Sequence, residues 1–424
     1  MYVADSRASK PASAEGAARP TPAGRRRAAV APTVLALGTV SLITDVSSEM
    51  VTAVLPLYLV AGLGLSPLGF GLLDGIYNGF SALVRLAGGH LADRGGGRHK
   101  WVAGLGYGIS ALCKPLLLLA HSLTPIGLVL AADRTGKGLR TAPRDALISL
   151  SSTPETRGRA FGVHRAMDTA GALLGPLAAF LILRATVDGY DAVFTVSFCV
   201  AVAGVLVLVL FVPGSSSAPA IETAVRPTLR AAVGLLRHRD VRRITVCALL
   251  LGLATVSDSF VYLLLQRRLG VPDRWFALLP LGTAAAFLLL AVPLGRLADR
   301  VGSRRVFLAG HGALLLAYAL LLTSWHGTFL PYAVLLLHGT FYAATDGVLM
   351  AAASDSVPEA LRSSGLAVVQ TGQALARFAC SLGFGAAWSL WGDRTALLAS
   401  TVALLLCATV SLAFLRPTAR EKAR

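Results

Sequence analysis

Two acidic residues, Asp45 and Glu49, stand four positions apart in an otherwise apolar stretch, residues 34–61. On a helix, residues at this spacing share one face, so the two carboxylates would lie one turn apart. In poorly hydrated surroundings, lost solvation and mutual repulsion both increase the affinity of a carboxylate for a proton. The chemistry that this pair could do is reversible proton binding. The alternative is a permanent ion pair with one of four cations, which are Arg85, Arg134, Lys137 and Arg165.

A second charged stretch, residues 133–145, lies in another apolar run and contains a proline, Pro143, that should kink or loosen its helix. Helical spacing puts four of its charged residues on one stripe: Asp133, Lys137, Arg140 and Arg144. A charge at mid-bilayer costs about 2.5–3.5 kcal/mol on insertion scales, so this density implies ion pairing, a wet cavity, or both. The proton-coupling candidates are Asp45, Glu49, Asp133, Arg134, Arg165 and Asp168.

The second half of the chain carries few charges in its apolar runs, chiefly Asp258, Asp346 and Arg377. Proton coupling is therefore expected in the first half of the chain, and the second half should contribute polar residues that line the substrate site. The substrate-binding candidates from both halves are Lys137, Arg140, Asp258, Tyr342, Asp346, Gln370 and Gln373. A role as buried structural polar residues is the alternative for those of the second half.

Composition indicates what must position these residues. Of the 424 residues, 55% are hydrophobic and only 14% are charged, against about 25% charged in soluble proteins. Apolar runs of about twenty residues recur, which predicts an all-α polytopic membrane protein. The net charge of +17 could suggest a nucleic-acid partner, but the arginines lie in short loops and tails, where topology and anionic lipids explain them better. The five cysteines lie in apolar runs without paired spacing, so neither disulfides nor a metal site are expected.

Twelve apolar spans can be read along the chain. They are residues 34–61, 69–92, 101–121, 125–150, 158–184 and 192–212, followed by 244–266, 275–298, 306–325, 329–351, 363–388 and 395–415. The predicted organisation is a disordered basic tail (1–33), six spans within 34–212, a linker (213–243), six spans within 244–415 and a short tail (416–424). A cytosolic start places the basic clusters inside, except Arg267, Arg268 and Arg274.

One phrase occurs in both halves at matching positions, between the second and third span of each. A glycine is followed four residues later by Asp-Arg, then by a glycine and basic residues; the glycine would allow close helix approach and the basic residues mark a cytosolic loop. The repeated residues are Gly89, Asp93, Arg94 and Arg98, then Gly295, Asp299, Arg300 and Arg304. The phrase resembles the signature loop of the major facilitator superfamily. That resemblance implies two pseudo-symmetric six-helix bundles, with these residues acting in the conformational switch.

Two further patterns resemble those of proton-coupled exporters in this superfamily. The fifth span contains Gly162, Gly171 and Gly175-Pro176 in the exporter frame, although Ala179 and Phe180 replace a closing glycine pair. Small residues on one face permit close crossing and Pro176 bends the helix, so these four residues join the candidates for the conformational switch. In the fourth span, Arg134 and Gly138 match a frame linked to proton coupling, with Lys137 where a glutamine is common.

The sequence therefore predicts a secondary transporter rather than an enzyme, without a cofactor. The favoured hypothesis is a monomeric proton/substrate antiporter exporting a small drug-like molecule or metabolite across a bacterial inner membrane, with both termini cytosolic; the bacterial source is inferred from the Ala- and Arg-rich composition. The first alternative is proton symport or exchange of an anionic solute bound by Arg134, Lys137, Arg140 and Arg165. The second is a non-transporting membrane sensor with the same fold.

Overall fold

The computed structural model describes residues 31–94, 99–153, 156–186, 189–213, 234, 239–324, 327–355 and 362–414. These residues form helices and connecting turns, with no strand among them. In chain order the elements are α1 (Pro32–Leu57), the short π-helix η1 (Tyr58–Gly62), α2 (Pro67–Arg94), α3 (His99–Leu119), α4 (Leu123–Leu150), α5 (Arg157–Ala185), α6 (Gly189–Phe211), α8 (Arg239–Ala254), α9 (Asp258–Leu269), α10 (Asp273–Phe276), α11 (Leu279–Val301), α12 (Ser303–Leu322), α13 (Leu330–Asp355) and α14 (Arg362–Phe414).

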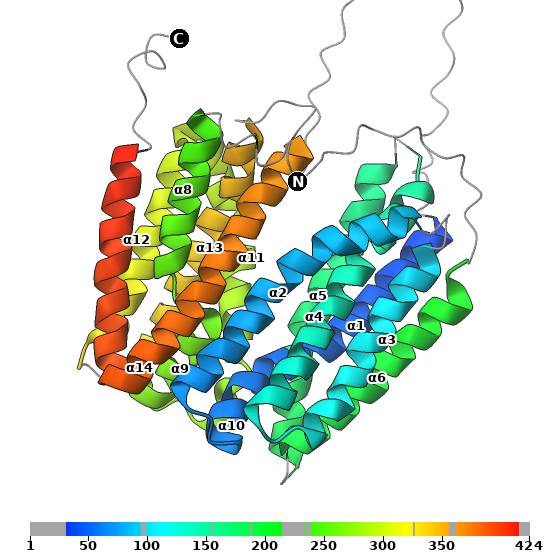
Figure 1. Ribbon diagram of the computed structural model, residues 1–424, viewed down its shortest axis with the longest axis horizontal. Helices are drawn as coiled ribbons and strands as arrows, with labels where there is room; N and C mark the ends of the chain where they lie inside the picture. The colour runs from blue at the N-terminus through cyan, green and yellow to red at the C-terminus, as the bar shows by residue number, and fades with distance from the viewer. Residues whose placement is uncertain are drawn as a thin grey trace, which may run out of the picture.

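The last helix reverses its direction in the middle. Gly392 has φ 83° and ψ 165°, a backbone conformation that side-chain-bearing residues rarely adopt, and it divides α14 into two arms. Figure 1 shows these arms running in opposite directions. With α8 and α9 counted as one span, the described helices make twelve membrane crossings, so the predicted all-α fold is confirmed.

One span differs from the predicted form. Residues 244–266 were expected as one continuous helix, but the chain is not helical between Ala254 and Asp258. Ser257 has an extended backbone conformation in the position before α9, and Asp258 is the first residue of that helix. An acidic first residue suits the positive end of a helix dipole, so the Ser257-Asp258 pair favours a new start here.

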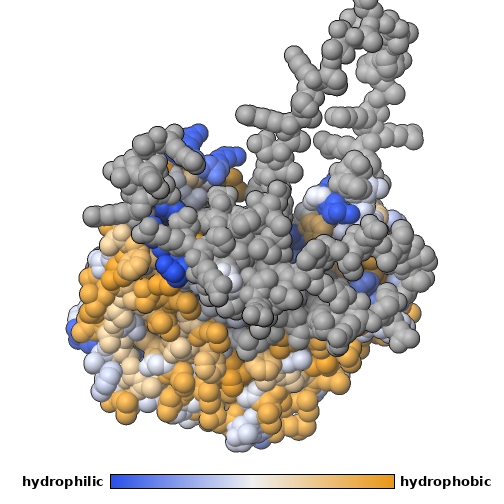
Figure 2. All heavy atoms as spheres, turned by 45° about the horizontal axis from the view of Figure 1, so that its top comes forward, coloured by the Kyte–Doolittle hydropathy of each residue, from blue (hydrophilic) through white to orange (hydrophobic). Residues whose placement is uncertain are grey.

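Apolar side chains cover the outside of the helices. Leu119, Leu289 and Leu390 are each at least 74% exposed, and Figure 2 shows hydrophobic residues over most of the visible described face. Eight described segments are long and apolar enough to cross a membrane, and one of them includes both arms of α14. A surface of this kind requires lipid rather than water around it.

The helices form two bundles that meet through α2 and α14. In the first bundle α1 packs against α5 and α6, and α4 packs against α2 and α3; in the second, α13 packs against α11 and α12. Between the bundles, a Cβ at Gly71 would lie 2.5 Å from the carbonyl oxygen of Ser381, so the two backbones are in direct contact. Phe70 and Phe260 also stack edge to face, 4.9 Å apart. These contacts lie toward the ends of the helices remote from the start of α1, as Figure 1 shows.

The predicted limits of the two tails and of the central linker fall largely outside the described residues. They stay a prediction, although α8 begins at Arg239, five residues before the expected 244.

Candidate functional site

The acids of α1 face the cations of α4 in a regular ladder. Asp45 Oδ1 lies 3.2 Å from Arg140 Nη2, and Glu49 Oε1 lies 3.9 Å from Lys137 Nζ. A third rung joins Arg144 Nη1 to the hydroxyl of Ser41 at 3.5 Å. Because the two helices run in opposite directions, the residue numbers rise along α1 while they fall along α4. Spacings of four residues on α1 and of three and four residues on α4 keep each set on one helix face, and this brings the rungs into register.

The two acid–base rungs differ in exposure. The Asp45 side chain is 13% exposed and its partner Arg140 only 4%, whereas Glu49 is 27% and Lys137 37% exposed. Arg140 also stacks over the ring of Tyr107, 4.5 Å from its centroid. The Asp45–Arg140 pair is thus closed, and the Glu49–Lys137 pair is long and open to its surroundings. Of the four cations weighed as permanent partners for the α1 acids, Lys137 alone pairs with one of them among the described ion pairs.

The glycines of α5 explain how a third helix reaches the same acids. A Cβ at Gly171 would lie 2.5 Å from the Leu42 carbonyl oxygen and 3.1 Å from Cβ of Asp45. At Gly175 it would lie 2.6 Å from Cβ of Glu49. Real Cβ atoms do not approach so closely, so these two positions let α5 lie directly against the ladder. Gly162 differs, because nothing lies within 4 Å of a Cβ there; no close helix crossing is found at this position in this conformation, and its role in the conformational switch stays a prediction.

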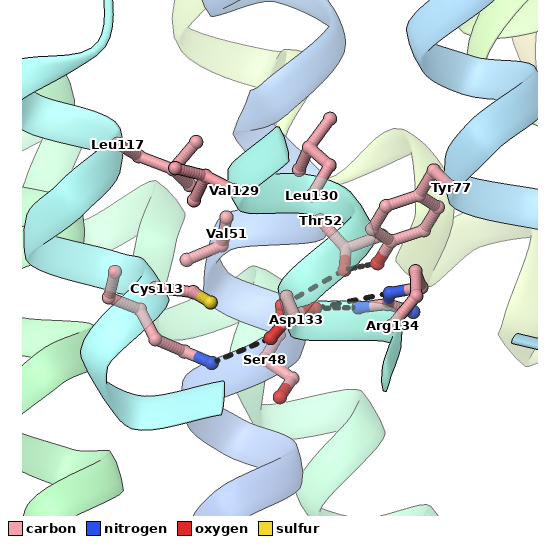
Figure 3. A pocket seen from close by; sticks show the side chains of 11 residues that line it. Ser48, Val51, Thr52, Tyr77, Cys113, Leu117, Val129, Leu130, Asp133 and Arg134 are labelled. Carbon is pink, nitrogen blue, oxygen red and sulfur yellow. Dashed lines mark hydrogen bonds and ion pairs between the residues drawn. The ribbon is translucent and has the colours of Figure 1, made fainter. Parts of the chain in front are cut away.

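A second ionic cluster lies around Asp133, at the N-terminal end of the α4 stripe. Asp133 Oδ2 accepts from Arg134 Nε at 3.1 Å, and Asp133 Oδ1 lies 3.4 Å from Lys114 Nζ of α3. The Arg134 guanidinium lies over the ring of Tyr77, 3.8 Å from its centroid, and the hydroxyls of Tyr77 and Thr52 are hydrogen bonded. Figure 3 shows these groups around a cavity of about 20 Å³, which has room for one water molecule.

Sequence reasoning missed Lys114 and Tyr77 in this cluster. A signal for Lys114 was present, since it is the one lysine inside the otherwise apolar residues 101–121. An intramembrane lysine is rare and usually has a partner. Tyr77 carried no comparable signal, because a single tyrosine in an apolar helix is ordinary.

The charged residues of α5 lie on the remaining side of the ladder. Asp168 lies 3.7 Å from Arg144 and 3.6 Å from Arg165, and it is close enough to interact with Asp45. The Arg165 side chain is 79% exposed, and its one ion pair described is with Asp168. Asp168 therefore belongs to the same network as the α1 acids, whereas Arg165 lies at its edge.

The second bundle gathers its polar residues around Asp258. Both His338 Nε2, at 3.0 Å, and the hydroxyl of Tyr342 donate to the same carboxylate oxygen, Oδ1. Two other candidates, Asp346 and Gln373, line one polar cavity together with Arg377. Gln370 is exposed one turn before Gln373 and does not line that cavity. The structure thus places six of the seven substrate-binding candidates in two clusters, one in each bundle, with His338 and Arg377 as additional members.

The repeated loop residues lie at helix ends on the side where α1 starts. Gly89, Asp93 and Arg94 fall in the last turns of α2, where side chains lie outside the described residues, as does Arg98. In the second copy, Asp299 and Arg300 lie in the last turn of α11 with exposed side chains, and Arg304 lies in the first turn of α12. Nothing lies within 4 Å of a Cβ at Gly295, so the close helix approach expected there is not found in this conformation.

A larger cavity lies elsewhere, beside α10 between α9 and α11. It has a volume of about 610 Å³ and is lined mainly by apolar side chains, among them Val271, Trp275 and Leu335. None of the predicted site residues lines it, and it carries no described charge. The candidate site is therefore made of the two polar clusters, one between α1 and α4 and the other between α9 and α13.

Comparison with known proteins identifies the family to which this fold belongs. The family model of the Major Facilitator Superfamily matches residues 37–288 and 276–424. An uncharacterized MFS-type transporter of Methanocaldococcus jannaschii is 30% identical over 381 residues, covering 88% of this chain and 92% of the relative.

Solved structures show the same fold at low sequence identity. A variant of the nucleoside transporter NupG superposes with a TM-score of 0.77 at 15% identity, covering 91% of this chain and all of that one. A bacterial homolog of the human lysosomal transporter Spinster, in an inward-facing and unoccupied conformation, gives 0.73 at 16% identity, covering 90% of this chain and 96% of that one. The chain belongs to the major facilitator superfamily and is a multi-pass secondary transporter of small molecules rather than an enzyme.

Proposed function

We propose that this protein is a proton/substrate antiporter that exports a small drug-like molecule or metabolite by alternating access. The observation that supports this most is the Glu49–Lys137 pair, which is 3.9 Å long and partly exposed beside the closed Asp45–Arg140 pair. A carboxylate that is weakly held and reachable from its surroundings can exchange a proton, whereas a closed pair keeps its charges. Glu49 is therefore the first candidate for the coupling proton and Asp45 the second.

The ladder provides a route from protonation to movement. A proton on Glu49 removes its charge, so Lys137 loses its partner and the α1–α4 contact weakens at that rung. Because Gly175 holds the α5 backbone against Glu49, a change at this rung reaches α5 directly. Substrate that binds beside the charged form then competes with the proton for the same state, which is the requirement for antiport.

Energy is sufficient for such a cycle. A driving force of about 150 mV supplies roughly 3.5 kcal/mol for one charge moved across the membrane. At about 1.4 kcal/mol per decade, that sustains a gradient of a few hundredfold. One proton for each substrate molecule is therefore enough for useful export.

The anion symport or exchange alternative is less well supported. Arg134 and Arg140 each lie against a carboxylate, and Arg144 has two acidic neighbours, Asp145 and Asp168. These acids leave little net positive charge to hold an anionic substrate. The substrates named for NupG and for the similar peptide transporter POT belong to those proteins, which are at most 15% identical to this chain.

The proposed setting is a bacterial cytoplasmic membrane, with one chain acting alone and both termini in the cytosol. The basic clusters of the tails, linker and repeated loops support this topology. Reporter fusions at Arg424 and near Pro219 should give cytoplasmic signals, and a periplasmic signal at either position would contradict it.

Antiport is tested with inside-out membrane vesicles from expressing cells, in which a pH-sensitive dye reports an imposed pH gradient. A broad compound panel is added to wild-type vesicles and to vesicles from cells with an empty vector. The proposal expects some compounds to dissipate the gradient only in wild-type vesicles, and the same compounds should be less toxic to expressing cells. Increased uptake of those compounds by intact cells would instead favour import.

A further inference from the structure

The hydrogen bonds of Asp258 leave one side of its carboxylate unused. Its Oδ1 accepts from both His338 and Tyr342, and Oδ2 has no hydrogen-bond partner among the described residues. The Asp258 side chain is 42% exposed, whereas that of His338 is fully buried. Because a carboxylate can only accept, His338 must donate through Nε2. One buried donor, His338, and one partly buried donor, Tyr342, thus hold one oxygen in place and leave the other without a described partner.

Aromatic rings surround this carboxylate. The rings of His338 and Tyr342 lie 5.4 Å apart at their centroids, and Tyr262 lies 6.3 Å from His338. Tyr262 is near enough to interact with both Asp258 and Glu49, the acids of the two bundles. A carboxylate close to aromatic rings is an arrangement that proteins use to bind organic ammonium groups, because a carboxylate and an aromatic ring both attract a cation.

The charges of the second bundle point to the same class of ligand. Arg377 interacts with both Asp258 and Asp346, so this cluster sets two acidic side chains against one arginine. Asp258 is also the first residue of α9, where its own charge already faces the positive end of the helix. An anionic group would meet repulsion here, and a cation would meet attraction.

Asp258 begins a helix of the second bundle that lies against the first bundle. α9 packs against α1, and Asp74 of α2 is close enough to interact with Ser257 and Asp258. Broken helices near the middle of a transporter commonly form the substrate site, and the break before Asp258 is such a place.

We infer that Asp258, held by His338 and Tyr342 and flanked by Tyr262, is the binding site for the positively charged group of the substrate. The substrate class is accordingly organic cations, either protonated amines or quaternary ammonium compounds with an apolar body. This inference rests on the proposed transport function, whose coupling site lies in the other bundle.

Binding to the purified full-length protein tests the inference without depending on coupling. The probes are a series of aryl-alkyl quaternary ammonium compounds and the carboxylates of the same ring and chain length, and the readout is the thermal unfolding midpoint at rising probe concentration. Wild-type protein should be stabilised by the cations and little by the carboxylates. Asp258→Asn should raise the half-saturating cation concentration at least tenfold. Asp273→Asn is the matched control, because Asp273 is an exposed acid on α10 whose Oδ1 accepts a hydrogen bond from Gln266 Nε2 at 2.8 Å.

Tyr342→Phe is a second variant that keeps the inference testable if Asp258→Asn does not fold. It removes one of the two donors to Oδ1 and leaves the ring, so it should weaken cation binding by a smaller factor, about threefold. Equal or greater stabilisation of the wild type by the carboxylates would overturn the inference, as would unchanged cation binding in Asp258→Asn. If the cations bind through Asp258 but never dissipate a pH gradient in vesicles, the inference stands and proton antiport is wrong.

Discussion

The two bundles treat their intramembrane charges differently. In the first, α1 and α4 place acids opposite cations at successive turns, as in Asp45–Arg140 and Glu49–Lys137. In the second, the corresponding spans are the broken α8–α9 and α13, and there one acid, Asp258, faces a histidine and a tyrosine instead. The repeated loop shows that the halves share a plan, so the difference lies in what each half has been adapted to do.

Acids paired with cations at short distance and an acid held by hydrogen bonds respond differently to a proton or a ligand. A ladder can rearrange its pairs when one acid is neutralised, and this suits coupling. A carboxylate with one unbonded oxygen can take a cation there while its other oxygen keeps both hydrogen bonds, and this suits recognition. Proton coupling is therefore assigned to the first bundle and recognition of the substrate's charge to the second.

The largest expected effect comes from breaking the closed rung. Arg140→Met leaves Asp45 buried without a cation at 3.2 Å, and removing one partner of a buried pair destabilises a protein by about 3–5 kcal/mol. Thermal unfolding of the purified variant should show this loss. Adding Asp45→Asn to the same chain should restore most of the stability, and normal stability of the single variant would contradict the closed pair.

A smaller effect is expected where α5 meets the ladder. Gly175→Val adds side-chain atoms at a position where even a Cβ would lie 2.6 Å from Cβ of Glu49. Overpacking of this kind costs about 1–3 kcal/mol. Gly162→Val is the control on the same helix, because its Cβ would meet nothing within 4 Å. Membrane abundance and unfolding midpoint should fall for the first and stay unchanged for the second; equal behaviour would mean that α5 does not lie against α1 as described.

The smallest effect compares the two copies of the repeated loop. If Asp93 holds one access state, Asp93→Asn should slow transport on the order of tenfold, within the range of conformational coupling energies, while membrane levels stay normal. Asp299→Asn should do less, because the charged ladder is in the first half and Asp299 is exposed at the end of α11. Transport rates of compounds identified in the vesicle screen measure both variants. Equal losses would indicate symmetric roles for the two loops.

The fold could be predicted closely because lipid imposes strong constraints. Spans such as 158–184 and 306–325 lie within three residues of α5 and α12, since an apolar run of membrane length has few alternatives. The break at Ser257 was missed because a three-residue interruption barely changes the apolarity of the run. Its one sequence signal was the Ser-Asp pair that starts a helix.

The members of the site could be predicted from the sequence better than the ion pairs that they form. Helical spacing of three or four residues identified Asp45, Glu49 and the α4 stripe, but one helix face does not reveal which cation meets which acid. Arg140 was placed among the substrate-binding candidates, yet it lies 3.2 Å from Asp45, because its partner depends on how α1 and α4 slide past each other. Lys114 comes from a third helix, and only the packing of α3 on α4 brings it to Asp133.

The most direct test of the account separates coupling from transport in Asp45→Asn and Glu49→Gln. Both substitutions keep side-chain shape and remove the titrating group. In proteoliposomes, a transported compound from the vesicle screen is followed in two modes, accumulation against its gradient driven by a pH gradient, and one-for-one exchange without one. The account predicts that at least one variant, Glu49→Gln first, loses accumulation but keeps exchange at near wild-type rates. If both variants still accumulate the compound at wild-type rates, the coupling proton does not bind to the α1 acids and the ladder is only structural.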